Sequence, residues 1–127
     1  MKGAVREAVR EARKFAAWIV VRCSGTPSAV DIGMKELEEM QKAGGYEGAG
    51  LRFVIRRNGQ IERGHRLAGD GGRVIISVCL VGGGDKDKKL EDNFTLAQRE
   101  SLAWLLKGLK VRYPLAVVVG LNDLLWG

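Results

Sequence analysis

The sequence contains little of what most metal and nucleophile sites are built from. Its 127 residues include a single histidine and two cysteines. That histidine, His65, cannot build a zinc site without cysteine or carboxylate partners, and none of these stands at ligand spacing around it. We therefore expect a solvent-facing His65 near a hairpin, with no metal, no cofactor and no catalytic residue.

Two further shortages exclude classes of protein. Aromatic residues make up 6% of the chain, which leaves few stacking partners for a single-stranded nucleic acid. No apolar run approaches the length of a transmembrane helix. Charges recur through residues 2–14, and the apolar run at residues 15–21 is short, so the N-terminus does not resemble a signal peptide. We expect a cytoplasmic protein without a membrane span.

The two cysteines fit reduced, buried thiols better than a disulfide, because the chain shows no export signal. Cys23 and Cys79 both lie in apolar, strand-like runs. A thiolate–imidazole pair of Cys23 with His65 is an alternative. The apolar surroundings favour a structural role for both thiols.

Positive charge is abundant. The formal net charge is +6, which favours anionic partners such as nucleic acid, a membrane surface or the bacterial wall. Basic residues gather in and after one predicted hairpin: Arg52, Arg56, Arg57, Arg63, Arg66 and Arg73, with Lys86, Lys88 and Lys89 following. A basic binding patch is one interpretation, and a charged sheet edge that resists aggregation is the favoured one.

The apolar pattern predicts one α/β domain over residues 1–127, with a mixed central β-sheet of about five strands flanked by helices. Residues 1–17 are predicted to form an additional basic, amphipathic helix, and residues 18–127 the core. The expected strands are 18–23, 52–57, 60–63, 74–81 and 115–119. The expected helices of the core run from residue 31 to about 42 and over 95–112.

Short motifs predict where the first half of these elements begins and ends. Asp31 is the expected cap of the first core helix, with Met34, Leu37 and Met40 facing inward. The pair Asn58–Gly59 predicts a hairpin in which both turn residues adopt positive φ.

In the second half, Thr95 and Gln98 predict a capping box for a helix that is apolar on one face. The segment Gly82–Lys86 follows a strand, as a phosphate loop would, but it lacks the Gly–Lys–Ser/Thr ending, so a turn is predicted. Residues 69–72 have too few carboxylates for calcium and are predicted to be part of a shortened loop.

Several segments resemble the zinc-dependent N-acetylmuramoyl-L-alanine amidases, above all their small phage and prophage lysozyme-type members. The strongest similarity is in the run Ile75–Gly83, followed by Asp85 and then Glu91–Gln98. Four other segments agree in order: Ile19–Pro27, Asp31–Gly33, Phe53–Gly59 and Val119–Gly120. The resemblance implies the amidase fold and, as the family's activity, zinc-dependent hydrolysis of peptidoglycan.

The positions where this resemblance implies zinc ligands hold other residues. The first histidine corresponds to Arg22 and the second to Leu121, while the third ligand belongs to a C-terminal segment that this chain is expected to lack. The catalytic tyrosine corresponds to Leu51, and Arg52 follows it. Because neither arginine nor leucine binds zinc, we expect the zinc site to be lost.

The former cleft is expected to be lined by Arg22, Leu51, Arg52, Leu121 and Asp123. Both arginines are expected to point into it. An unpaired buried guanidinium costs roughly 3–5 kcal/mol. We therefore expect Arg22 to meet Asp123, another nearby carboxylate or an anion from solution.

Three hypotheses on function remain, and the two that are favoured describe a protein without enzymatic activity. The favoured one is a catalytically degenerate amidase-like protein, derived from a phage or prophage, that retains affinity for peptidoglycan fragments. The alternative is a regulatory or structural protein that binds another protein or nucleic acid, with the basic helix at residues 1–17 as the contact. A second alternative is an active peptidoglycan amidase with a non-standard site.

Overall fold

Two largely apolar strands form the centre of the sheet. The computed structural model describes residue 4 and residues 17–43, 51–64, 68–70 and 73–120. Within it, β1 (Ala17–Cys23) and β5 (Arg73–Leu80) pair in parallel, with Ile19 opposite Ile76. Both isoleucines are at most 1% exposed. Such continuous apolar runs are typical of parallel strands that are covered on both faces.

The other strands extend the sheet on either side of this pair. β2 (Leu51–Ile55) is parallel to β5, β6 (Val117–Gly120) is parallel to β1, and β3 (Ile61–Arg63) is antiparallel to β2. β4 (Ala68–Asp70) pairs antiparallel with β5. Among the described residues the sheet therefore has six strands, in the order β3-β2-β5-β1-β6 with β4 beside β5. The predicted mixed sheet flanked by helices is confirmed.

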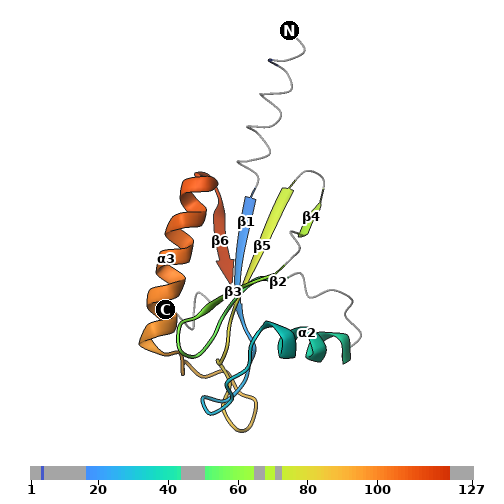
Figure 1. Ribbon diagram of the computed structural model, residues 1–127, viewed down its shortest axis with the longest axis vertical. Helices are drawn as coiled ribbons and strands as arrows, with labels where there is room; N and C mark the ends of the chain where they lie inside the picture. Colours follow the sequence, from blue (N-terminus) through green and yellow to red (C-terminus); the bar gives the residue numbers. More distant parts are fainter. Residues whose placement is uncertain (1–3, 5–16, 44–50, 65–67, 71–72, 121–127) are drawn as a thin grey trace.

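Each face of the sheet has its own apolar core. On one face, α3 (Leu96–Arg112) packs Leu102 and Leu105 against residues of β1 and β5. On the other face, α2 (Met34–Ala43) packs Met34 and Leu37 against Leu51, Val54, Cys79 and Val81. Figure 1 shows the two helices on opposite sides of the sheet, with α2 beside its lower end.

The α2 side of the sheet continues beyond these core residues onto β1 and β6. Trp18 is in register with Val117, and Val20 with Val119, so all four side chains share this face with Arg22. Trp18 is 37% exposed and Val117 is 48% exposed. We call these five residues the open strip.

A β-bulge at Arg52 sets the direction of the side chains in β2. Leu51 pairs with Ser77 and Phe53 with Val78, so two residues of β2 oppose one of β5. As a result Leu51 packs on the α2 side, whereas Phe53 packs on the α3 side. A regular strand would place both on the same face.

The capping box at the start of α3 also joins two strands. Thr95 Oγ1 accepts a hydrogen bond from the backbone amide of Gln98, and Gln98 Oε1 accepts one from the backbone amide of Thr95, both at 3.0 Å. The Gln98 side chain is fully buried, and its Nε2 donates to the carbonyl oxygens of Ile55 and Val81 at 3.1 and 2.7 Å. The predicted capping box is confirmed, and Gln98 additionally ties α3 to the ends of β2 and β5.

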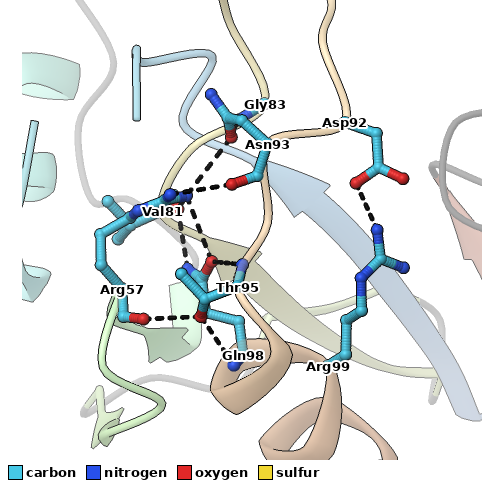
Figure 2. A network of polar contacts seen from close by, with 8 residues as sticks. All are labelled: Arg57, Val81, Gly83, Asp92, Asn93, Thr95, Gln98 and Arg99. Carbon is cyan, nitrogen blue, oxygen red and sulfur yellow. Dashed lines mark hydrogen bonds and ion pairs between the residues drawn. The ribbon is translucent and has the colours of Figure 1, made fainter. Parts of the chain in front are cut away.

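Arg57 completes this network, as Figure 2 shows. Its Nη1 donates to Gln98 Oε1 and to the Val81 carbonyl, each at 3.3 Å, and its Nη2 donates to the Asn93 carbonyl at 2.8 Å. Its own carbonyl accepts from Thr95 Oγ1 at 2.7 Å. The hairpin after β2 and the loop before α3 are thereby held together.

The start of α2 differs from the prediction. The helix begins at Met34, and Asp31 does not cap it but lies 3.7 Å from Arg56 Nη2. The Met34 amide donates instead to Glu62 Oε1 at 3.2 Å. The sequence pattern around the helix does not contain this cap, because Glu62 belongs to β3.

Two other local predictions were wrong. Met40 was expected to face inward but is 52% exposed, because at 100° per residue it lies about 120° around the helix from Met34. Of the expected positive-φ pair, only Gly59 has positive φ, at 87°. The amide oxygen of Asn58 accepts from the Gln60 amide at 2.9 Å, which stabilises a turn with ordinary φ at Asn58.

The expected loop at residues 68–73 contains β4, which pairs with the first residues of β5. A three-residue strand with a central glycine has no alternating apolar pattern by which a sequence could predict it. The predicted helix at residues 1–17 lies outside the described residues, apart from Ala4, which is helical, and Ala17, which begins β1. No helix in the described part of the chain is long and apolar enough to cross a lipid bilayer.

Replacing Gln98 with leucine is expected to lower the free energy of unfolding by roughly 2–4 kcal/mol, because two buried carbonyl groups each lose one donor, and Arg57 and the Thr95 backbone amide lose an acceptor. Urea unfolding followed by circular dichroism measures this as a lower midpoint at unchanged slope. The matched control is Glu100→Ala, an exposed position on the same helix, which should stay within about 0.5 kcal/mol of the parent. A Gln98→Leu variant as stable as that control would contradict the assigned role.

Candidate functional site

The open strip contains an arginine that folds back over the sheet. Arg22 is the penultimate residue of β1 and is in register with Cys79 of β5. Its Nη2 donates a hydrogen bond of 3.4 Å to Ser77 Oγ, although Ser77 is in register with Val20, two residues earlier. The guanidinium therefore lies over the row of side chains that contains Ser77, and not beyond the end of β1.

Leu51 belongs to the same row of side chains, because it is the partner of Ser77 on β2. Both residues are 3% exposed, and Leu51 packs in the core under α2. Arg22 and Leu51, identified from distant segments of the sequence, are thus brought to opposite sides of one buried serine. The β-bulge after Leu51 makes this meeting possible.

Arg52 has its described contacts at the other edge of β2. Its Nη1 donates to the carbonyl oxygen of Gly64, which follows β3. Its guanidinium carbon lies 5.6 Å from the ring centroid of Phe53, within cation–π range. Neither contact joins Arg52 to Arg22, and its predicted place in the former cleft stays a prediction.

Three residues named from the sequence, His65, Leu121 and Asp123, lie outside the described residues. The pairing of Arg22 with Asp123 therefore stays a prediction. The ion pairs within the described ranges join Arg56 to Asp31 and Glu62, and Arg99 to Asp92, so none of them includes Arg22.

The described residues do not fit a zinc ion. Among them, no three histidine, cysteine, aspartate or glutamate side chains gather closely enough to hold a metal. Where the family resemblance implies the first ligand, Arg22 carries a permanent positive charge, and where it implies the tyrosine, Leu51 has no polar atom. No zinc-dependent step can be built from these side chains.

The glycine-rich turn after β5 has its backbone amides already bonded. Three consecutive amides donate to protein oxygens at 2.8 to 3.1 Å: Gly82 to Ser24 Oγ, Gly83 to Asn93 Oδ1 and Gly84 to the Thr26 carbonyl. A phosphate loop needs such amides directed at its ligand. The predicted turn is confirmed in preference to a phosphate site.

Arginines of the suggested basic patch are bound to protein groups where the structure describes them. Arg57 belongs to the network around Gln98, Arg56 pairs with Asp31 and Glu62, and Arg52 donates to Gly64. Guanidinia that are committed to such contacts stabilise the sheet edge. Their arrangement favours the structural interpretation over a nucleic-acid patch.

Comparison with known proteins identifies the family. The chain is 38% identical over 117 residues to the endolysin of Klebsiella phage KP32, which covers 87% of this chain and 78% of that protein. It is 37% identical over 106 residues to the endolysin of Escherichia phage T7, covering 79% and 70%. The chain belongs to the phage endolysin family. No protein-family model matches it.

Solved structures share the fold of this endolysin-family chain. The endolysin amidase LysCS from Clostridium intestinale URNW has a TM-score of 0.61 at 20% identity, covering 91% of this chain and 75% of that one. The Ph2119 endolysin from a Thermus scotoductus bacteriophage has a TM-score of 0.57 at 19% identity, covering 87% and 73%. At these identities the likeness shows the fold alone. The predicted amidase-like fold is thereby confirmed, and the phage relatives confirm the predicted relationship to phage endolysins.

Ser77 is the residue of this endolysin-family site that the sequence did not reveal. It stands in the middle of a central strand that is otherwise apolar from residue 74 to residue 80, and it is 3% exposed. A buried hydroxyl needs a hydrogen-bond partner, so a serine in such a strand is itself a usable signal. The partner is Arg22, which reaches Ser77 from two residues beyond Val20, the residue in register with the serine.

Burial raises the pKa of the Cys79 thiol to about 12, which keeps it protonated. At pH 8 about one such thiol in ten thousand is therefore ionised and nucleophilic. In a Cys23→Ser variant, where Cys79 is the remaining cysteine, iodoacetamide is expected to label the protein only after unfolding in urea. Mass spectrometry measures the labelling, and rapid modification of the native variant at pH 8 would contradict the assigned burial.

Proposed function

We propose that this member of the endolysin family binds peptidoglycan through the open strip and does not hydrolyse it by zinc catalysis. The observation that supports the proposal is Arg22 with its guanidinium on Ser77. This cation lies at the position where the family resemblance implies the first zinc ligand. In this proposal the chain binds peptidoglycan, the target implied by the family, without the zinc-dependent hydrolysis that the family resemblance implies.

A guanidinium at this place is incompatible with a zinc centre for two reasons. It remains protonated at any physiological pH, so it has no lone pair to offer the metal. It also repels a divalent cation, by about 4 kcal/mol for two unit charges 4 Å apart at the dielectric constant effective near a protein surface, and by twice that for Zn²⁺. The described residues consequently provide no set of ligands for a catalytic zinc that would activate a water molecule.

The open strip offers a surface suited to a wall fragment. Trp18 and Val117 expose apolar area at one end of the strip, and Arg22 carries a positive charge at the other end. Sugar rings and peptide backbones combine apolar faces with polar groups, so a ligand of this kind can use both parts. The net charge of +6 adds a general attraction to an anionic polymer.

The second candidate function is lysis by hydrolysis of peptidoglycan. Identities of 37% and 38% to phage proteins named endolysin favour it. It requires catalytic groups that the described residues do not supply, so residues beyond them would have to complete the site. Binding of a protein or nucleic acid through residues 1–17 stays a prediction, because that segment lies outside the described residues.

Protein purified without chelator is expected to contain far less than one zinc per chain by elemental analysis after dialysis. It is expected to release no more dye from labelled bacterial sacculi than buffer does. Treatment with EDTA should leave the thermal midpoint unchanged, because the apolar strands and α3 stabilise the fold. Stoichiometric zinc together with dye release would establish the lytic alternative and overturn the proposal.

Wall binding is expected to survive added salt. Exposed charges are screened within about 3 Å at 1 M ionic strength, so adhesion by net charge alone should disappear there. The protein should co-sediment with purified sacculi at 1 M sodium chloride and be displaced by soluble muropeptides. A triple variant, Lys86→Gln with Lys88→Gln and Lys89→Gln, is the matched control and should bind equally, because these exposed lysines lie outside the open strip. Sedimentation that vanishes in salt, and that soluble muropeptides do not displace at low salt, would rule out specific binding.

A further inference from the structure

We propose that Arg22, positioned by Ser77, binds a free carboxylate of the peptidoglycan stem peptide. This inference rests on the proposed function and names the chemical group that the open strip recognises. The carboxylate would be held by the guanidinium on the α2 side of the sheet. Ser77 acts as a positioning residue that keeps the guanidinium over the strip.

The hydrogen bond to Ser77 leaves most of the guanidinium available. A guanidinium has five N–H donors, and the described contact occupies one nitrogen, Nη2, at 3.4 Å from Ser77 Oγ. Arg22 is exposed, whereas Ser77 is 3% exposed, so the contact fixes the inner side of the group and leaves its outer side toward solvent. A planar carboxylate can accept two parallel hydrogen bonds from such a group.

The surroundings of Arg22 strengthen an ion pair formed there. Val20 and Leu51 flank Ser77 in the row over which the guanidinium lies, and Leu51 is 3% exposed. Apolar neighbours on one side of a charge lower the effective dielectric constant, which makes its attraction to an anion stronger than in water. None of the ion pairs within the described ranges satisfies this charge internally.

A stem-peptide carboxylate fits these features better than a wall phosphate. Arg22 stands at one end of the open strip, and Trp18 at the other presents a partly exposed apolar ring. A peptide can place aliphatic groups along the strip while its carboxylate reaches the guanidinium. A phosphodiester chain has no comparable apolar part to bury.

The test uses two soluble probes of the same shape. The first is N-acetylmuramoyl-L-alanyl-D-glutamate with free carboxylates, and the second is the same compound with both carboxylates converted to carboxamides. Isothermal titration calorimetry of the full chain should show the first probe binding about 10-fold to 100-fold more tightly, the range expected for a hydrogen bond to a charged group. Arg22→Gln should weaken the first probe by a similar factor and leave the second unchanged.

Ser77→Gly tests positioning separately. It should weaken the first probe in the parent protein but have no further effect in the Arg22→Gln background, since the serine acts through the arginine. Arg22→Lys keeps the positive charge but loses the two parallel N–H donors of the guanidinium, so it should bind the first probe more tightly than Arg22→Gln and less tightly than the parent. Circular dichroism and thermal midpoints of each variant exclude loss of folding as the cause.

The two proposals fail in distinguishable ways. If sacculi and both probes bind equally well to the parent and to Arg22→Gln, the protein binds the wall but the carboxylate assignment is wrong. If neither sacculi nor either probe binds the parent, the proposed function is wrong and the carboxylate assignment falls with it. If inorganic phosphate at equal concentration displaces the first probe while amidation has no effect, the site prefers phosphate and the inference is overturned.

Discussion

The side chain of Gln98 is the contact on which the arrangement of the domain depends. It is fully buried, yet it satisfies the carbonyl groups of two neighbouring strands and closes the first turn of α3. Burying an amide in this way is favourable only when all of its polar atoms find partners. The carbonyl groups of Ile55 and Val81 therefore have to lie within reach of the same side chain, and this requirement fixes where β2 and β5 end relative to α3.

Anchoring at that level has an effect on the opposite face. β2 and β5 are held together at their ends by Gln98 and Arg57, and the bulge lies further back along β2. Leu51 consequently lies on one side of Ser77, and Arg22 lies on the other side. The register of β2 against β5 thus determines both the polar network around Gln98 on the α3 side and the row of Leu51, Ser77 and Arg22 on the α2 side.

Much of the fold was predictable because its signals are local. Thr95 and Gln98 form their capping box within four residues, and the apolar runs of β1 and β5 need no information from elsewhere. The errors have the opposite character. Beside the local bond from the Gly33 backbone amide to Glu36 Oε2, the first turn of α2 is capped by Glu62 from another strand, and β4 exists only through its pairing with β5. Contacts between distant segments override local preference in both cases.

The candidate site was predictable in its members and not in its geometry. Family resemblance singled out Arg22 and Leu51, because flanking motifs fix their positions in the chain. It could not supply Ser77 as their common neighbour, since that follows from a parallel register and from a bulge. The resemblance also gave no reason to place Arg52 apart from Arg22 and Leu51, although the described partners of Arg52 lie across the β2–β3 edge.

The bulge has a consequence for how this protein tolerates changes in length. Substituting Arg52 alters one side chain, but deleting it would restore regular alternation to β2. Leu51 would then directly precede Phe53 and would keep both its pairing with Ser77 and its place in the α2 layer. The bulge therefore lets β2 lose this one residue without moving the side chains of Leu51 and Phe53 from one layer to the other.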